Sequence, residues 1–228
     1  MTDEDLCFTP AVALLDEMRR GTLSSAELTA AVLARIGRLE PRLNAFMTLL
    51  GDEAMAAARA ADDERARGGD RPLLGVPVTI KDLQSLAGVP LRSGSHTTES
   101  VVPERDAPFV ARLKDAGAVI LGKTTTPEFG WKGVSESPLT GVTSNPWRPG
   151  YNAGASSAGA GAGAAAGYGP LHQGSDGAGS IRMPAHFSGV FGLKPTYGRI
   201  PNWPVPNNDQ GSHIGPLTRT VADAALML

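Results

Sequence analysis

The stretch AGASSAGAGAGAAAG, at Ala153–Gly167, consists of alanine and glycine except for Ser156 and Ser157. Residues this small allow backbone segments to approach closely, and they leave two hydroxyls as the only side-chain groups capable of chemistry. Linkers usually carry serine and charge, whereas this run leads directly into compact motifs. We therefore expect Gly159–Gly167 to form a helix packed tightly against a sheet.

A second glycine-rich segment, GSDGAGSIRMP at Gly174–Pro184, adds a third serine, Ser180. The backbone amides of Asp176–Ser180 follow one another with almost no side chains in the way. Successive amides of this kind form a nest for negative charge. Because such nests bind phosphate as well as a developing oxyanion, this feature alone does not identify a reaction.

The sequence upstream of these segments predicts an α/β fold. Leu74–Asp82 (LGVPVTIKD) is a short apolar and β-branched run, which is typical of a buried strand with Lys81 at its carboxyl end. From Ala107, PFVARLKDAG predicts an amphipathic helix and AVILGK a second buried strand. Functional groups of open α/β sheets gather outside the carboxyl ends of strands, so Lys81 is a candidate functional residue.

The remaining segments predict mainly helices and loops. Ser24 and Glu27 have the spacing of a capping box, at the start of a helix that we expect Pro41 to end. Thr218–Leu228 begins a helix with a threonine cap and stops before any C-cap, so we expect the chain to be part of something longer. Further expected elements are a helix over 11–21, a helix over 53–67, a short strand over 190–195 and a proline-rich loop over 200–208.

The composition indicates a globular protein in a reducing compartment. Of the 228 residues, 41% are hydrophobic and 19% charged, and the net charge of −2 gives no general electrostatic reason to expect a nucleic acid or a membrane as partner. The single cysteine, Cys7, excludes an internal disulfide framework. With no secretory signal and no apolar run of about 18–20 residues, we expect a cytoplasmic protein.

Three kinds of chemistry fit these residues. Gly117–Thr124 (GAVILGKT) matches the phosphate-loop pattern, although its central residues are typical of a strand and no helix start follows. A serine nucleophile needs a base, and a Ser-His-Asp triad stays open, although no nucleophile elbow accompanies any histidine. Lysine serves as a base when burial favours its neutral amine, as a strand end would do for Lys81.

Several motifs, in order, resemble the amidase signature family, whose members are serine hydrolases of linear amides. The resemblance covers essentially the whole chain and is most specific over residues 74–200. Family members commonly have glycine where this chain has Ala155 and Ala158, and serine where it has Ala160. The motifs are VPVTIKD, AGAVILGKTTTPEFG, SNPWRP, GASSAGAGAGAA, GSDGAGSIRMPAHFSGVFGLKPTYGR and GPLTRTVADAA.

The resemblance implies a catalytic Ser–cis-Ser–Lys triad. Ser180 falls at the nucleophile position, Ser156 at the serine that follows a cis peptide bond, and Lys81 at the base. It also implies an oxyanion hole and a supporting network, and it requires no metal and no organic cofactor. The oxyanion amides would belong to Gly177, Ala178, Gly179 and Ser180, and the supporting residues would be Ser157, Asp176 and Arg182.

The implied protein is an amidohydrolase that releases a carboxylate and ammonia or an amine. Its fold would be a mixed open sheet flanked by helices and incomplete at the C-terminus. Residues 1–228 would form the N-terminal and central portion of one amidase signature domain, with a helical region over 1–70 and the catalytic core over 71–228. The same triad fits the glutaminase component of a tRNA-dependent amidotransferase, which works with partner chains.

The resemblance implies a small-molecule amide as substrate, without direct contact to nucleic acid or membrane. It leaves open a second chain, a missing C-terminal half and a homodimer. Outside this chemistry, two other interpretations stand: a nucleotide-binding module that uses Gly117–Thr124, and a catalytically silent interaction domain.

Overall fold

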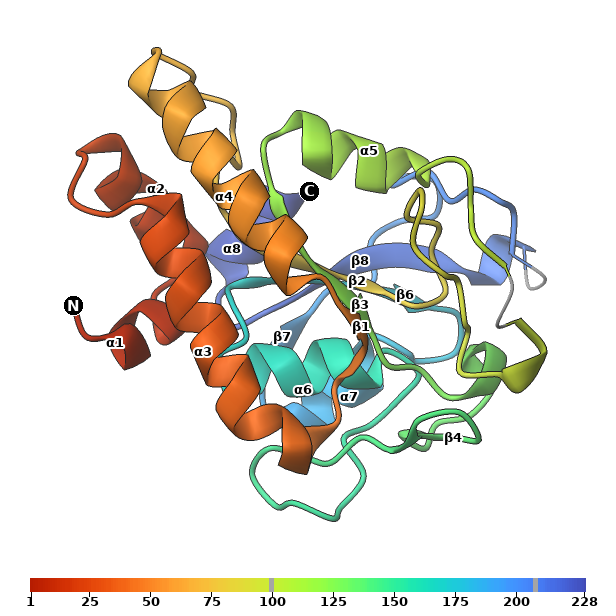
Figure 1. Cartoon of the computed structure of the whole chain (residues 1–228). Coiled ribbons are helices and arrows are strands. Elements are labelled where there is room, and N and C mark those ends of the chain that lie inside the picture. Colours follow the sequence, from red (N-terminus) through yellow and green to blue (C-terminus); the bar gives the residue numbers. More distant parts are fainter. Residues whose placement is uncertain (99–100, 207–208) are drawn as a thin grey trace.

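A six-stranded mixed sheet forms the centre of the computed structural model, which describes residues 1–98, 101–206 and 209–228 (Figure 1). The strand order is β1-β3-β2-β6-β8-β7. β2 runs parallel to β3 and β6, whereas β1, β8 and β7 pair antiparallel with their neighbours, which confirms the predicted α/β class with a mixed sheet. The strands are β1 Phe46–Leu49, β2 Pro77–Lys81, β3 Val119–Thr124, β6 Leu171–Asp176, β7 Phe191–Gly192 and β8 His213–Thr218.

Helices cover both faces of this sheet (Figure 1). Leu217 of β8 packs against helices α6 and α7, whereas Ile214 and Pro216 of the same strand face a cavity that α5 and α8 also line. Because side chains alternate along a strand, these helix pairs lie on opposite faces. The helices are α1 Asp3–Phe8, α2 Ala11–Arg19, α3 Ser25–Leu43, α4 Gly51–Ala66, α5 Pro108–Asp115, α6 Ala158–Ala166, α7 Arg182–Ser188 and α8 Val221–Met227.

Short elements connect these helices and strands. β4 Glu136–Ser137 and β5 Gly141–Val142 form a separate hairpin, and 3-10 turns lie at His96–Thr98, Glu128–Gly130 and Asp209–Gly211. The predicted proline-rich loop over 200–208 includes residues 207 and 208, which lie outside the described residues. No helix in the described part of the chain combines the length and apolarity needed to cross a bilayer.

Helix α6 confirms the prediction of a closely packed helix of small residues. A Cβ added at Gly159 would overlap the Ala45 carbonyl oxygen, and one at Gly161 would lie 2.8 Å from the side chain of Pro184. The Gly159 amide also donates a hydrogen bond to the Thr125 carbonyl oxygen, at 3.2 Å. The small side chains therefore let α6 rest directly on backbone at the carboxyl end of β3 and on α7.

The N-terminal helices follow most of their sequence signals. Ser24 and Glu27 form the predicted capping box of α3, with the Glu27 amide donating to Ser24 Oγ at 3.0 Å. Pro41 does not end this helix, contrary to the prediction, because the Asn44 amide still donates to the Glu40 carbonyl at 2.8 Å. The helix ends where Asn44 takes the left-handed conformation, with φ of 53°.

The sequence patterns do not predict α1, α7, β6 or β8. Strand β6 reads LHQGSD, which has little apolar character, yet all six residues are buried. Its polar side chains find partners inside the protein, as His172 Nδ1 does with Thr79 Oγ1 at 2.8 Å. Residues 1–70, predicted as a helical region, contain four helices and also supply β1 to the sheet.

Candidate active site

Lys81 is the last residue of β2, and its side chain is fully buried. Its Nζ lies in hydrogen-bond contact with Ser156 Oγ, at 2.7 Å, and with Ser175 Oγ, at 3.1 Å. Burial lowers the pKa of Lys81 to about 7, although the charge of Asp176 acts to raise it. A large fraction of the Lys81 amines is therefore neutral near pH 7 and able to accept a proton.

Ser156 lies at the entry to α6 and follows a cis peptide bond from Ala155, as the family resemblance implied. The chain passes very close to it, since a Cβ added at Gly130 would lie 3.1 Å from Ser156 Oγ. Gly130 has a φ of 69°, which glycine adopts without strain. The Ser156 hydroxyl therefore has Lys81 Nζ and Gly130 as close neighbours.

Ser157 connects three segments of the site. Its Oγ donates to the Ser175 carbonyl oxygen at 3.2 Å and accepts from the Ser175 amide at 3.2 Å. Its own amide donates to the Ser180 carbonyl oxygen at 3.1 Å. These contacts fix the end of β6 and the backbone of Ser180 against the start of α6.

Ser180 and Ser156 line the same cavity, which has a volume of about 590 Å³. Ser180 is partly exposed there, and its Oγ makes no hydrogen bond to any described residue. Ser156 is nearly fully buried and is engaged by Lys81. The accessible hydroxyl is therefore that of Ser180, and the hydroxyl nearest the buried amine is that of Ser156.

Asp176 organises the loop that carries Ser180. Its buried carboxylate accepts hydrogen bonds from the amides of Gly179, at 2.7 Å, and Ile181, at 3.1 Å, and two from the Arg182 side chain, each at 3.0 Å. Burial acts to raise the pKa of Asp176, but the hydrogen bonds from Arg182 and the backbone outweigh it and hold the pKa below its ordinary value. Asp176 is therefore charged at neutral pH.

The predicted oxyanion amides differ in their contacts. The Gly179 amide already donates to Asp176, and Gly179 does not line the cavity. The amides of Gly177, Ala178 and Ser180 have no acceptor among the described residues, and all three residues line the cavity. Among the four predicted amides, these three are therefore without an acceptor among the described residues.

Three further polar residues surround the site, and the sequence patterns single out none of them. Ser175 Oγ contacts Lys81 Nζ, Gln173 Oε1 accepts from the Lys81 amide at 2.9 Å, and Lys194 Nζ donates to the Gly177 carbonyl oxygen at 2.7 Å. The first two lie on β6, which was not predicted. A strand assignment over 171–176 beside Lys81 would have pointed to both.

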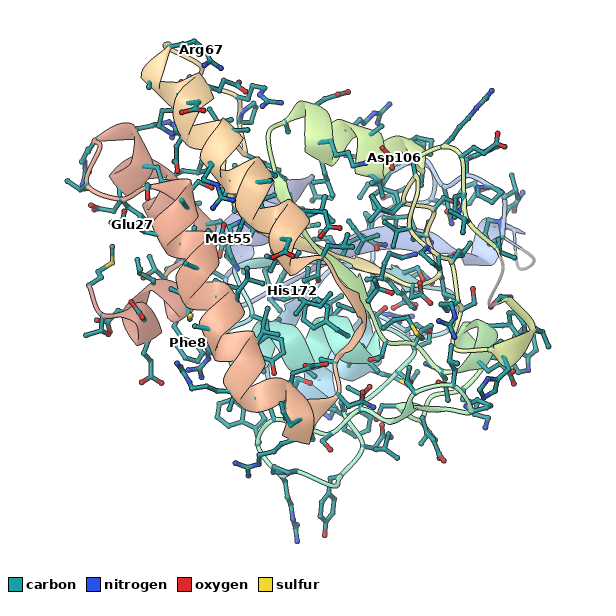
Figure 2. All side chains as sticks on the ribbon, viewed as in Figure 1. Phe8, Glu27, Met55, Arg67, Asp106 and His172 are labelled. Atoms are coloured by element: carbon teal, nitrogen blue, oxygen red, sulfur yellow. The ribbon has the colours of Figure 1, made fainter. Side chains whose placement is uncertain are left out.

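No described histidine lines this cavity. His172 lies in the interior (Figure 2), where it contacts Thr79 Oγ1 and the Gly169 carbonyl oxygen. Burial, and secondarily the charge of Arg219, lower the pKa of His172 to about 3. The geometry therefore does not support a Ser-His-Asp triad.

Gly117–Thr124 does not form a phosphate loop. Most of it is strand β3, and Lys123 Nζ lies 2.9 Å from Asp82 Oδ1 in a fully buried ion pair. Burial raises the pKa of Asp82 and lowers that of Lys123, and the charge of each partner opposes the shift of the other. The Lys123 ammonium therefore lies in the sheet interior, paired with Asp82.

Within the described residues, no group of three or more His, Cys, Asp or Glu residues is placed to hold a metal ion.

Comparison with known proteins matches residues 27–228 to the family model described as Amidase. The indoleacetamide hydrolase of Bradyrhizobium diazoefficiens is 43% identical over 226 residues, which cover 96% of this chain and 43% of that protein. A glutamyl-tRNA(Gln) amidotransferase component from a Roseiflexus species is 45% identical over 214 residues, which cover 93% of this chain and 44% of that protein.

Solved structures share this architecture. The peptide amidase of Stenotrophomonas maltophilia superposes with a TM-score of 0.88 at 36% identity, over 96% of this chain and 47% of that one. The chain thus spans about half the length of the curated relatives it matches.

Proposed function

Because this chain belongs to the amidase signature family, we propose that it provides the catalytic centre of an amidohydrolase that cleaves a linear carboxylic amide. The reaction passes through a seryl acyl-enzyme and releases a carboxylate and ammonia or an amine. The observation that carries the proposal is the 2.7 Å contact between the buried Lys81 amine and Ser156 Oγ, at a cavity that Ser180 also lines. A serine needs such a base to become a nucleophile at neutral pH.

In the first half of the reaction, neutral Lys81 accepts the proton of Ser156 while Ser156 takes the proton of Ser180. The Ser180 oxygen then forms a bond to the amide carbonyl carbon, and the carbonyl electron pair moves onto its oxygen. This oxyanion accepts hydrogen bonds from the free amides of the loop. We assign that role to the amides of Gly177, Ala178 and Ser180.

Collapse of the intermediate breaks the C–N bond. The proton held by Lys81 returns through Ser156 to the departing nitrogen, which leaves as ammonia or an amine. Water then attacks the acyl-enzyme with the same relay acting as base, so that Ser180 and the carboxylate are released. Asp176, Arg182 and Ser157 hold the loop and the relay in place.

Amide hydrolysis by the protein that carries this sequence tests the proposal. We expect ammonia release from a panel of primary amides, and a loss of about 10³-fold or more in kcat for each of Lys81→Met, Ser156→Ala and Ser180→Ala, since members of a catalytic unit fail together. Ser212 lines the same cavity and hydrogen-bonds to Asn202, away from the relay, so Ser212→Ala is the matched control. Undiminished hydrolysis by the Ser180→Ala protein would refute the assignment of Ser180 as the nucleophile.

The 45% identity to an amidotransferase component favours a second candidate, the glutaminase of a tRNA-dependent amidotransferase. It would use the same residues on glutamine and depend on partner chains. Glutaminase assays with and without those partner chains separate the two candidates. Ammonia from glutamine only in the complex would select this candidate, whereas turnover of simple amides by the isolated protein selects the free amidohydrolase.

A further inference from the structure

Lys194 lies close behind the loop that carries the proposed oxyanion amides. It follows β7, at a point where the neighbouring Leu193 amide donates to the Pro216 carbonyl oxygen of β8, at 3.1 Å. Its side chain is 22% exposed, and Lys194 does not line the cavity. The ammonium therefore approaches the loop from the protein side and does not touch a molecule bound in the cavity.

The contacts of Lys194 fall on one peptide group. Its Nζ donates to the Gly177 carbonyl oxygen at 2.7 Å and lies 3.6 Å from Asp176 Oδ1. The Gly177–Ala178 peptide is not among the cis bonds of the described chain. In a planar trans peptide the carbonyl and the following amide point in opposite directions. A carbonyl held against Lys194 therefore directs the Ala178 amide away from Lys194, and Ala178 lines the cavity whereas Lys194 does not.

The loop needs such a restraint. The Gly177–Ala178 peptide turns over by rotation about ψ of Gly177 and φ of Ala178, and glycine at position 177 permits the first rotation readily. Asp176 restrains the later part of the loop through the amides of Gly179 and Ile181, but it accepts no hydrogen bond from Gly177 or Ala178. Within the described residues, Lys194 makes the one hydrogen bond that fixes the Gly177–Ala178 peptide.

We propose that Lys194 is a positioning residue of the oxyanion hole, which orients the Ala178 amide toward the reacting carbonyl by holding the Gly177 carbonyl. This role rests on the proposed function. A charged donor on the carbonyl also polarises the peptide and strengthens its N–H as a donor. The benefit is greatest when the bound oxygen carries negative charge, so it acts on the transition state more than on the bound amide.

The test compares Lys194→Met with Lys194→Arg in the protein that carries this sequence. The matched control is Lys114→Met, because Lys114 is also partly buried and ion-paired, with Asp106 at 2.7 Å, but lies on α5. We expect Lys194→Met to lower kcat by at least about tenfold, with KM changed by less than about threefold, and Lys194→Arg to restore most of the rate. A peptide-aldehyde or boronic acid analogue, which forms an oxyanion adduct, should lose affinity in parallel with kcat/KM.

Two results in solution would overturn the proposal: kcat/KM within about twofold of the wild type in Lys194→Met, or a loss of rate with unchanged affinity for the analogue. A crystal structure of Lys194→Met gives a readout that needs no activity. We expect the Gly177–Ala178 peptide to be turned or disordered there, and an unchanged orientation contradicts the role of Lys194. Absence of amide turnover in the wild-type protein would instead reject the proposed function, and the crystal structure would still decide the role of Lys194.

Discussion

At the scale of single residues, the proposed chemistry of the site depends on the balance of two forces at Lys81. Burial in the sheet disfavours the ammonium, and the negative charge of Asp176 favours it, with burial the larger effect. The resulting pKa of about 7 places the amine where a general base is most effective at neutral pH. Lys123, equally buried but paired directly with Asp82, keeps a charge partner and takes no part in the proposed relay.

This balance predicts the pH profile. Only neutral Lys81 accepts a proton, and its neutral fraction increases with pH through the pKa. We expect kcat/KM to rise about tenfold per pH unit below pH 7 and to level off above about pH 8. Initial rates between about pH 5 and pH 9 measure it, and Lys81→Arg, which stays charged, should show no such rise. A rate that falls as pH increases through about 7 would contradict the assignment of the base.

The same shift predicts a cost in stability. The folded-state pKa of Lys81 lies below the unfolded-state value, so between about pH 7 and pH 10 the unfolded chain binds more protons. Stability should therefore fall as pH is lowered across this interval. Lys81→Met removes the penalty, and we expect it to raise the free energy of unfolding at about pH 7 while it abolishes activity. Urea titrations of both proteins measure the free energy of unfolding, and a variant less stable than the wild type would contradict the claim that buried Lys81 destabilises the fold.

Sequence patterns predicted some residues of the site and not others, for a physical reason. Lys81 ends an apolar β-branched run, and Ser156 and Ser180 stand out in segments with few other side chains. Ser175 and Lys194 carry no local signal, since Ser175 is placed by the pairing of β6 between β2 and β8, and Lys194 by the pairing of β7 with β8. The acceptor of the Gly179 amide also depends on how the loop folds back on Asp176, which composition does not reveal.

At the scale of elements, α6 depends on its glycines for contact, and Gly159 tests this. The methyl of Gly159→Ala would overlap the Ala45 carbonyl oxygen and lie 2.7 Å from the Thr125 amide nitrogen. We expect the substitution to lower the free energy of unfolding by about 1–3 kcal/mol, the usual cost of overpacking. Denaturant titration measures the change.

The matched control for this substitution is Gly37→Ala, in helix α3. Gly37 is exposed, and an added Cβ there meets no atom within 4 Å. Alanine is favoured over glycine inside a helix, so we expect a gain of about 0.5–1 kcal/mol. Equal stability changes in the two variants would mean that close packing does not explain the glycines of α6.

The buried ion pair between β2 and β3 gives a second prediction at this scale. Asp82→Asn leaves the fully buried Lys123 ammonium without its charge partner. We expect a loss of about 3–5 kcal/mol in unfolding free energy, typical of an uncompensated buried charge. Asp70→Asn, which breaks the exposed pair of Asp70 with Arg19, should cost at most about 1 kcal/mol. Comparable losses in thermal or urea unfolding would contradict the role assigned to burial.

Elements with strong local signals were predictable, and those stabilised by tertiary contacts were not. The capping box at Ser24 and the apolar runs at β2 and β3 correctly indicated a helix and two strands. Strand β6 was not predicted because its polar side chains find hydrogen-bond partners only among neighbours that the fold brings to them. The prediction that Pro41 ends α3 was wrong because Pro41 lies within the last turn of the helix, which is already near its end.

At the scale of the whole molecule, the fold brings together segments that lie far apart in the chain. Lys81 ends β2, the Asp176–Ser180 loop follows β6, and β2 and β6 are parallel neighbours. The carboxyl ends of parallel neighbours meet at one edge of the sheet, and the entry to α6 delivers Ser156 to the same place. The sequence predicted the α/β class, but the strand order follows from pairings that no local pattern encodes.

The central claim is that Ser180 becomes acylated because Lys81 activates it through Ser156. Labelling of the protein that carries this sequence with a fluorophosphonate, followed by mass spectrometry of the modified peptide, tests it most directly. We predict a single adduct on Ser180, no adduct in Ser180→Ala, and labelling slowed at least about 10²-fold in Ser156→Ala and Lys81→Met. Persistent labelling of the Ser180→Ala protein, or an adduct on any other residue of the wild type, would contradict the claim.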